Sequence, residues 1–115
     1  MEELLNRILA KDPDAIILVQ GDHGTAFLMN WQLPLKEWPA AGNAERLAPM
    51  NAIRLPERCG NMLYPTMSLV NSFRAVFACL ENRKADFLPD ISYISPDSDS
   101  QEFGHVLRVD PNKEK

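Results

Sequence analysis

Apolar and polar positions near the N-terminus predict a helix followed by a strand. Between residues 2 and 11, four apolar residues fall on one stripe of a helix that starts with acidic residues and ends at Lys11. They are Leu4, Leu5, Ile8 and Leu9. Pro13 ends this helix, because proline disfavours helical geometry in the residue before it. Residues 15–20 form an apolar, β-branched run without polar alternation, which is typical of a strand buried on both faces.

The rest of the pattern adds a second strand, a longer helix and several short elements. Residues 50–55 predict a strand that ends at Pro56, and residues 69–82 predict a helix with Ser68 as its N-cap. We expect one apolar stripe of this helix to face the core. It consists of Leu69, Val70, Phe73, Val76, Phe77 and Leu80. Weaker signals predict a helical turn at 43–47 and short strands at 91–95 and 103–109.

Together these elements predict an α/β fold, with a partial, mostly parallel sheet flanked by helices. Strands 15–20 and 50–55 would form the sheet, helix 69–82 would pack across it, and helix 2–11 would cover one face. A length of 115 residues with 45% hydrophobic and 24% charged residues is ordinary for one globular domain. We expect residues 1–110 to fold and residues 111–115 to fray.

Between these elements, residues 30–45 predict an irregular loop that contains Trp31 and Trp38. Loops of this length often have a function. This one either covers a neighbouring site or packs its tryptophans back against the body of the domain.

Charge and hydropathy exclude some classes of function. The net charge of −4 has the wrong sign for a protein that binds nucleic acid through phosphate contacts. The longest apolar run, residues 75–80, is too short for a membrane span, which needs about 20 residues. The first residues also lack the basic and long apolar segments of a secretory signal. Cys59 and Cys79 lack the spacing of a metal or redox motif and are either small apolar core residues or one disulfide.

The tripeptide Asp22-His23-Gly24 follows the first predicted strand directly. The carboxyl end of a strand is where open α/β sheets present their ligands and catalytic groups. Carboxylate and imidazole are both good ligands for zinc or manganese. Gly21 and Gly24 flank the pair and allow the chain to turn so that both side chains reach one ion. The sequence therefore predicts a metal-binding turn.

This segment also carries a resemblance to a known family. Residues 16–24 resemble the strand and metal-binding Asp-His-Gly turn of the alkaline phosphatase superfamily, which includes sulfatases, phosphodiesterases and the sulfatase-like lipoteichoic acid synthases. Two later blocks resemble the C-terminal part of a sulfatase-like branch found in bacterial membrane proteins. They are residues 45–56 with 63–74, and residues 87–95. Met50 departs from that pattern, which has leucine there.

The resemblance implies that residues 1–110 are the C-terminal part of a sulfatase-like catalytic domain, a piece of an alkaline phosphatase-like fold. Asp22 and His23 would then be the late metal ligands for a divalent ion, Zn, Mn, Ca or Mg. The nucleophile and at least one further acidic ligand would lie on earlier strands that this sequence does not contain. Such a chain supplies about half of a metal site, since zinc needs about four ligands.

Other polar residues have ordinary structural explanations at least as good as catalytic ones. His105 is a possible further ligand, but a surface histidine in a terminal strand is the more common case. Asn71 and Arg74 fall in a resembling block, although an arginine on an amphipathic helix is usually structural. No base is assigned to the hydroxyls of Thr25, Thr66 or Ser68, and no nucleophile elbow is present.

Two functions follow. The first is a fragment of a metal-dependent sulfatase-like hydrolase or transferase acting on phosphate or sulfate esters, inactive alone and completed by a missing N-terminal portion. Relatives of that branch are commonly membrane-anchored with an extracytoplasmic catalytic domain. The second is a non-enzymatic α/β module that binds a partner or forms an oligomer through an exposed sheet edge and helix face.

Overall fold

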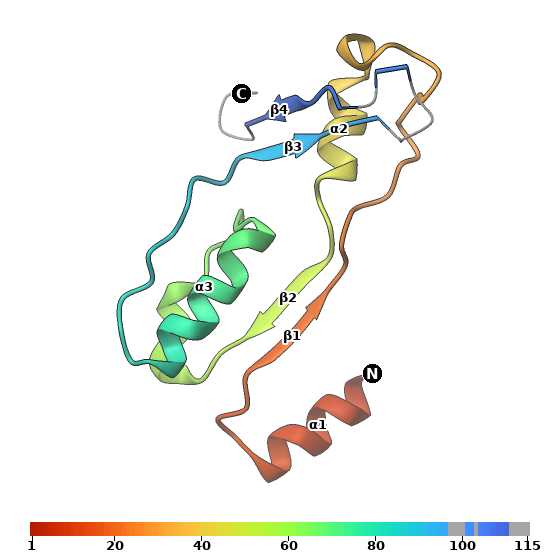
Figure 1. Ribbon diagram of the computed structural model, residues 1–115. Helices are drawn as coiled ribbons and strands as arrows, with labels where there is room; N and C mark the ends of the chain where they lie inside the picture. Colours follow the sequence, from red (N-terminus) through yellow and green to blue (C-terminus); the bar gives the residue numbers. More distant parts are fainter. Residues whose placement is uncertain (97–100, 103, 111–115) are drawn as a thin grey trace. The chain divides into compact units, whose positions relative to one another are not determined.

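The computed structural model describes residues 1–96, 101–102 and 104–110 and contains a mixture of helices and strands (Figure 1). Most elements lie near their predicted positions, whereas η1 and η2 were not predicted and α2 begins within the predicted irregular loop. They are α1 (Glu2–Lys11), β1 (Ile17–Gln20), η1 (Leu35–Glu37), α2 (Ala40–Arg46), β2 (Asn51–Arg54), η2 (Glu57–Met62), α3 (Leu69–Leu80), β3 (Ser92–Ile94) and β4 (Leu107–Val109). The tail at 111–115 that the sequence predicts to fray lies outside the described residues.

The strands form two small sheets, β1 with β2 and β3 with β4. The arrows of β1 and β2 run in opposite directions in Figure 1, and β3 pairs antiparallel with β4. The described strands therefore pair antiparallel, in place of the mostly parallel sheet that the sequence predicts. The reason lies in the segment between β1 and β2. Its ends are joined by a hydrogen bond from Gly21 N to Met50 O (2.8 Å), so the chain returns as a long hairpin and makes no crossover.

Contacts divide the chain into two compact units, each built from two segments. The first unit contains residues 1–19 and 51–89, and the second contains residues 20–50 and 90–115. In the first unit, buried Leu55, Cys59, Ala75, Val76 and Cys79 form the core. Leu18 of β1, Ile53 of β2 and Ile16, which precedes β1, pack against this core and are partly buried. The first strand is thus half-buried along its length rather than covered on both faces.

Helix α3 turns a different face inward from the one that its hydrophobic pattern predicts. Its buried residues are Asn71, Ser72, Ala75, Val76, Ala78 and Cys79. Four large apolar residues of the predicted core stripe are exposed instead, namely Val70, Phe73, Phe77 and Leu80. The inward face is fixed by specific bonds, because Cys79 is covalently linked and Asn71 is hydrogen-bonded to the neighbouring loop. Ser68 precedes the helix as expected, but its side chain does not make the capping hydrogen bond.

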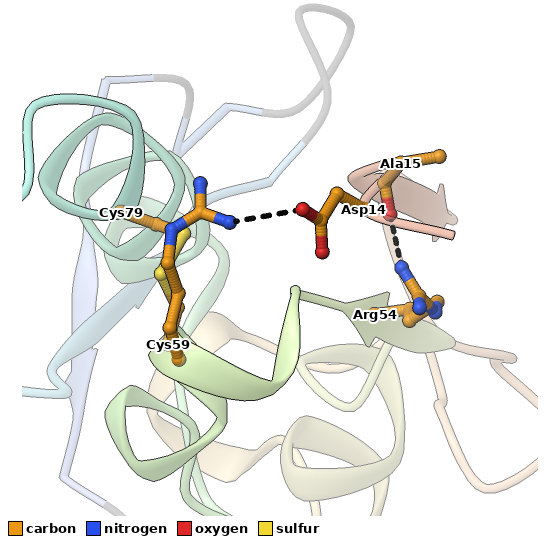
Figure 2. Close-up of a disulfide and its surroundings, with 6 residues drawn as sticks. Asp14, Ala15, Arg54, Cys59 and Cys79 are labelled. Carbon is orange, nitrogen blue, oxygen red and sulfur yellow. Dashed lines mark hydrogen bonds and ion pairs between the residues drawn. A yellow bond between two sulfur atoms is a disulfide. The ribbon is translucent and has the colours of Figure 1, made fainter. Parts of the chain in front are cut away.

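A disulfide between Cys59 and Cys79 links η2 to α3 (Figure 2). Both cysteines are buried, with Cα atoms 5.6 Å apart. This finding decides between the two interpretations of the cysteines in favour of the disulfide. Nearby, Arg58 pairs with Asp14 (3.7 Å), and the Arg54 guanidinium donates to the carbonyl of Ala15, which ties the end of β2 to the segment before β1.

Two side chains of α3 hold the segment that follows it. The Asn71 amide donates to Leu88 O (2.8 Å) and to the Tyr64 hydroxyl (3.0 Å), and its oxygen accepts from Leu88 N (2.9 Å). Arg74 donates to the carbonyl of Asp86 (2.8 Å). Both residues therefore have structural roles that account for their places in the sequence.

The second unit has its own core of Leu35, Trp38, Ile94 and Val109. Trp38 donates from its indole to Leu33 O (3.0 Å), so this tryptophan packs back on its own unit, as one of the two alternatives for the loop predicts. Trp31 meets Trp38 edge to face, with ring centroids 5.0 Å apart, and remains partly exposed. In the described part of the chain, no helix is long and apolar enough to span a membrane.

Candidate metal centre

The Asp22-His23-Gly24 turn follows β1 and leads into the second unit. Gly24 N donates to Arg46 O (2.8 Å), which fixes the turn against the end of α2. A Cβ atom at Gly24 would lie 1.9 Å from Glu45 O and 2.9 Å from Ala48 O. Glycine is therefore required here by the close approach of two backbones. The predicted turn is present, although its glycine serves backbone packing.

Asp22 and His23 direct polar atoms toward each other at this turn. Asp22 Oδ1 lies 3.7 Å from His23 Nε2, and the two side chains are 90% and 50% exposed. Two ligands of one tetrahedral ion, each about 2.1 Å from it, lie about 3.4 Å apart. The observed separation is close to that value. The donor types and their spacing thus fit a divalent cation held between the carboxylate oxygen and the imidazole nitrogen.

The other ring nitrogen of His23 faces groups of the protein. His23 Nδ1 lies 2.9 Å from Gly24 O and 2.7 Å from Arg46 Nη1. Histidines that bind metal ions through one nitrogen usually donate the other N–H to a backbone carbonyl or a carboxylate. Gly24 O occupies the place of such an outer partner.

Arg46 is a site residue that the sequence did not single out. Besides His23, its Nη1 donates to Gly24 O (3.1 Å), and its guanidinium carbon lies 6.0 Å from the centre of the Trp31 ring. That distance is at the outer limit of a cation–π contact. The sequence did place Arg46 near the end of the predicted helical turn at 43–47. No sequence pattern, however, links residue 46 to residue 23.

Glu45 anchors the loop that follows the turn. Its carboxylate accepts hydrogen bonds from the Thr25 hydroxyl, from Phe27 N (3.2 Å) and from Leu28 N (2.8 Å). The Thr25 bond first, and then the backbone bond of Leu28, lower the pKa of Glu45 below its ordinary value of 4.5. A carboxylate with a lowered pKa and three donors is a weak base. The Thr25 hydroxyl thus helps to anchor the loop through Glu45.

The lowered pKa of Glu45 predicts a loop that survives mild acid. Hydrogen bonds to the charged carboxylate are fully present above the ordinary pKa and are lost only as the pH falls through the lower folded-state value. The amide proton of Leu28 should therefore shift with a midpoint below 4.5 in an NMR titration. Glu45→Gln is the matched control and should remove the transition. A midpoint at or above the ordinary value would contradict the anchoring role.

The remaining candidate residues are divided between the two units. Asn71, Arg74, Thr66 and Ser68 belong to the first unit, whereas Asp22 and His23 form the turn in the second. His105 lies in the second unit and is exposed. Among the described residues, no group of three or more His, Cys, Asp or Glu side chains is placed to hold a metal ion. Asp22 and His23 therefore stay a predicted pair of ligands.

Comparison of the chain with protein-family models, with curated proteins and with solved structures gives no match.

Proposed function

We propose that this chain contributes Asp22 and His23 to a divalent metal centre that acts on phosphate or sulfate esters, as the C-terminal portion of a sulfatase-like hydrolase or transferase. The observation that carries this proposal is the 3.7 Å approach of Asp22 Oδ1 to His23 Nε2 on an exposed turn. A carboxylate and an imidazole at this spacing suit one cation, and the turn leaves them open to a substrate.

A divalent ion bound there would supply Lewis-acid polarisation of the ester oxygen and would lower the pKa of an attacking group. The chain's own residues would hold this ion and orient its imidazole ligand. Asp22 supplies negative charge, His23 supplies a neutral nitrogen, and Gly24 O fixes the plane of the ring. Two protein ligands form a weak site, so we expect the chain alone to be inactive on ester substrates.

The fold that the resemblance implies, a piece of an alkaline phosphatase-like domain, is part of the same proposal. In this chain, hydrogen bonds join two of the resembling segments. Asn71 and Arg74 lie in the helix block and bind the backbone of Leu88 and Asp86, next to or within the following block.

Metal binding is the test of this function. Titration of the isotope-labelled chain with Mn²⁺ should broaden the NMR signals of Asp22 and His23 before any others. Asp22→Asn and His23→Gln should each weaken binding by about tenfold or more, since loss of even an outer partner costs metal sites about 10–100-fold. His105→Gln is the matched control and should bind as the parent does. Uniform broadening, or equal loss in the control, would reject the site.

A partner-binding module is the second candidate, and the exposed stripe of α3 favours it. Val70, Phe73, Phe77 and Leu80 are each at least 50% exposed and recur at alternating spacings of three and four residues. That spacing is the seam of a two-helix pair and is self-complementary, so the partner in this hypothesis is a second copy of the chain. Light scattering should then report a dimer that Phe77→Glu dissociates. A monomer at all concentrations would reject this alternative.

A further inference from the structure

The surroundings of His23 Nδ1 contain a conflict between two hydrogen bonds. Arg46 Nη1, 2.7 Å away, carries only donors and needs a lone pair on Nδ1. Gly24 O, 2.9 Å away, is an acceptor and needs a proton on Nδ1. A neutral imidazole nitrogen is either a donor or an acceptor, so only one of these bonds exists at a time. The proton of the ring occupies the other nitrogen in the first case and Nδ1 in the second.

The two tautomers differ in their ability to bind a cation. With Arg46 bonded to Nδ1, the proton sits on Nε2 and points toward Asp22, so Nε2 has no lone pair for a metal ion. With Nδ1–H bonded to Gly24 O, the lone pair of Nε2 faces Asp22 Oδ1, and both atoms are available to one ion. Arg46 therefore competes with the metal for His23 through the opposite side of the ring.

We propose that Arg46 is a positioning residue that holds His23 in the tautomer unable to bind metal, and that cation binding releases Arg46. The proton moves from Nε2 to Nδ1 through solvent, with no change in the total number of protons on the ring. This inference rests on the proposed metal function of Asp22 and His23.

The released guanidinium has two partners close by. Its Nη1 already lies 3.1 Å from Gly24 O, and the Trp31 ring lies 6.0 Å from its central carbon. Gly24 O has two lone pairs, so it can accept from Nδ1 and keep its bond from Nη1. The guanidinium, once it no longer bonds to Nδ1, can move closer to the face of the Trp31 ring. Trp31 is 47% exposed, so its fluorescence responds to a cation that settles on the ring.

The tautomer of His23 gives a direct test that does not depend on activity. Long-range ¹H–¹⁵N spectra at about pH 8, where free imidazole is neutral, distinguish a protonated Nδ1 from a protonated Nε2. We expect the metal-free chain to carry the proton on Nε2. Arg46→Met keeps the length of the side chain and the backbone bond to Gly24 but removes the donor. Metal-free Arg46→Met should therefore show the proton on Nδ1.

Metal binding gives the second readout. Zn²⁺ should move the proton of the parent to Nδ1 and change the fluorescence of Trp31, and Arg46→Met should bind Zn²⁺ about five- to tenfold more tightly without the fluorescence change. Removal of a positive charge alone would also tighten binding, but it would leave the metal-free tautomer unaltered. Trp31→Phe is the control for the source of the fluorescence signal.

The outcomes separate the two proposals. A metal-free parent with the proton on Nδ1, or an unaltered tautomer in Arg46→Met, overturns the role of Arg46 even if Zn²⁺ binds. If the tautomers are as predicted but Zn²⁺ does not bind, the result supports the hydrogen bond from Arg46 to His23. The same result overturns both the release of Arg46 and the metal function. Binding of Zn²⁺ with the predicted tautomers and the fluorescence change supports the whole inference.

Discussion

Reduction of the Cys59–Cys79 disulfide is expected to lower the free energy of unfolding of the first unit by about 3 kcal/mol, because the bond closes a loop with a sequence separation of 20 residues. Without the bond, the unfolded chain regains the entropy of that loop, whereas the folded core of Leu55, Ala75 and Val76 is otherwise preserved. The bond also holds Cys79 of α3 on the buried face of the helix. Urea denaturation of the oxidised and reduced chain, followed by circular dichroism, measures the difference.

Two controls sharpen this experiment. Cys59→Ala/Cys79→Ala removes the bond irreversibly and should resemble the reduced chain, with a further loss from the buried sulfur atoms of both residues. Addition of reductant to this double variant should change nothing. Equal stability of the oxidised and reduced chains would show that the disulfide does not hold α3 against η2. Disulfides persist in oxidising surroundings, so the chain must be purified without reductant.

Asn71→Ala is expected to cost the first unit about 2 kcal/mol. The Asn71 side chain is fully buried, and its hydrogen bonds include two to the backbone of Leu88 and one to Tyr64. Alanine leaves the amide and the carbonyl of Leu88 without these partners, and each bond contributes about 0.5–1.5 kcal/mol. We place the total below the sum of three bonds because Leu88 is 43% exposed and water reaches its backbone.

The control for this substitution lies in the same unit. Asn61 is exposed in η2, and Asn61→Ala should change the free energy of unfolding by at most about 0.5 kcal/mol. Thermal or urea unfolding of both variants provides the comparison, and hydrogen exchange at Leu88 N should accelerate only in Asn71→Ala. A fully stable Asn71→Ala with a protected Leu88 amide would disprove the bridging role.

Local sequence patterns determined the positions of most elements. Helix α1 follows from its apolar stripe and from Pro13, and β1 and β2 follow from short apolar runs that end at a turn or at Pro56. These signals come from residues that are neighbours along the chain. Their backbone preferences and apolar spacing predict an element without information from distant segments. The prediction of a metal-binding turn also uses local signals alone, since Asp22, His23 and Gly24 are adjacent.

Relationships between distant segments were decided by the tertiary structure. The direction of β2 against β1 depends on how residues 21–50 return, and a hydrophobic run has no direction of its own. The inward face of α3 was mispredicted because a large apolar side chain marks a face that can be buried, whereas a disulfide and the bonds of Asn71 decide which face is buried. The same reason explains why Arg46 and Glu45 were not predicted as site residues. Their contacts with His23 and Thr25 join residues about twenty positions apart in the sequence.

The sequence by itself determined where most helices and strands lie and that Asp22, His23 and Gly24 form a turn after the first strand, because those properties depend on neighbours along the chain. Only the tertiary structure decided the strand pairing, the buried face of α3, the disulfide and the contact between Arg46 and His23. Each of these depends on atoms that are far apart in sequence, whose approach is set by the packing of the whole unit.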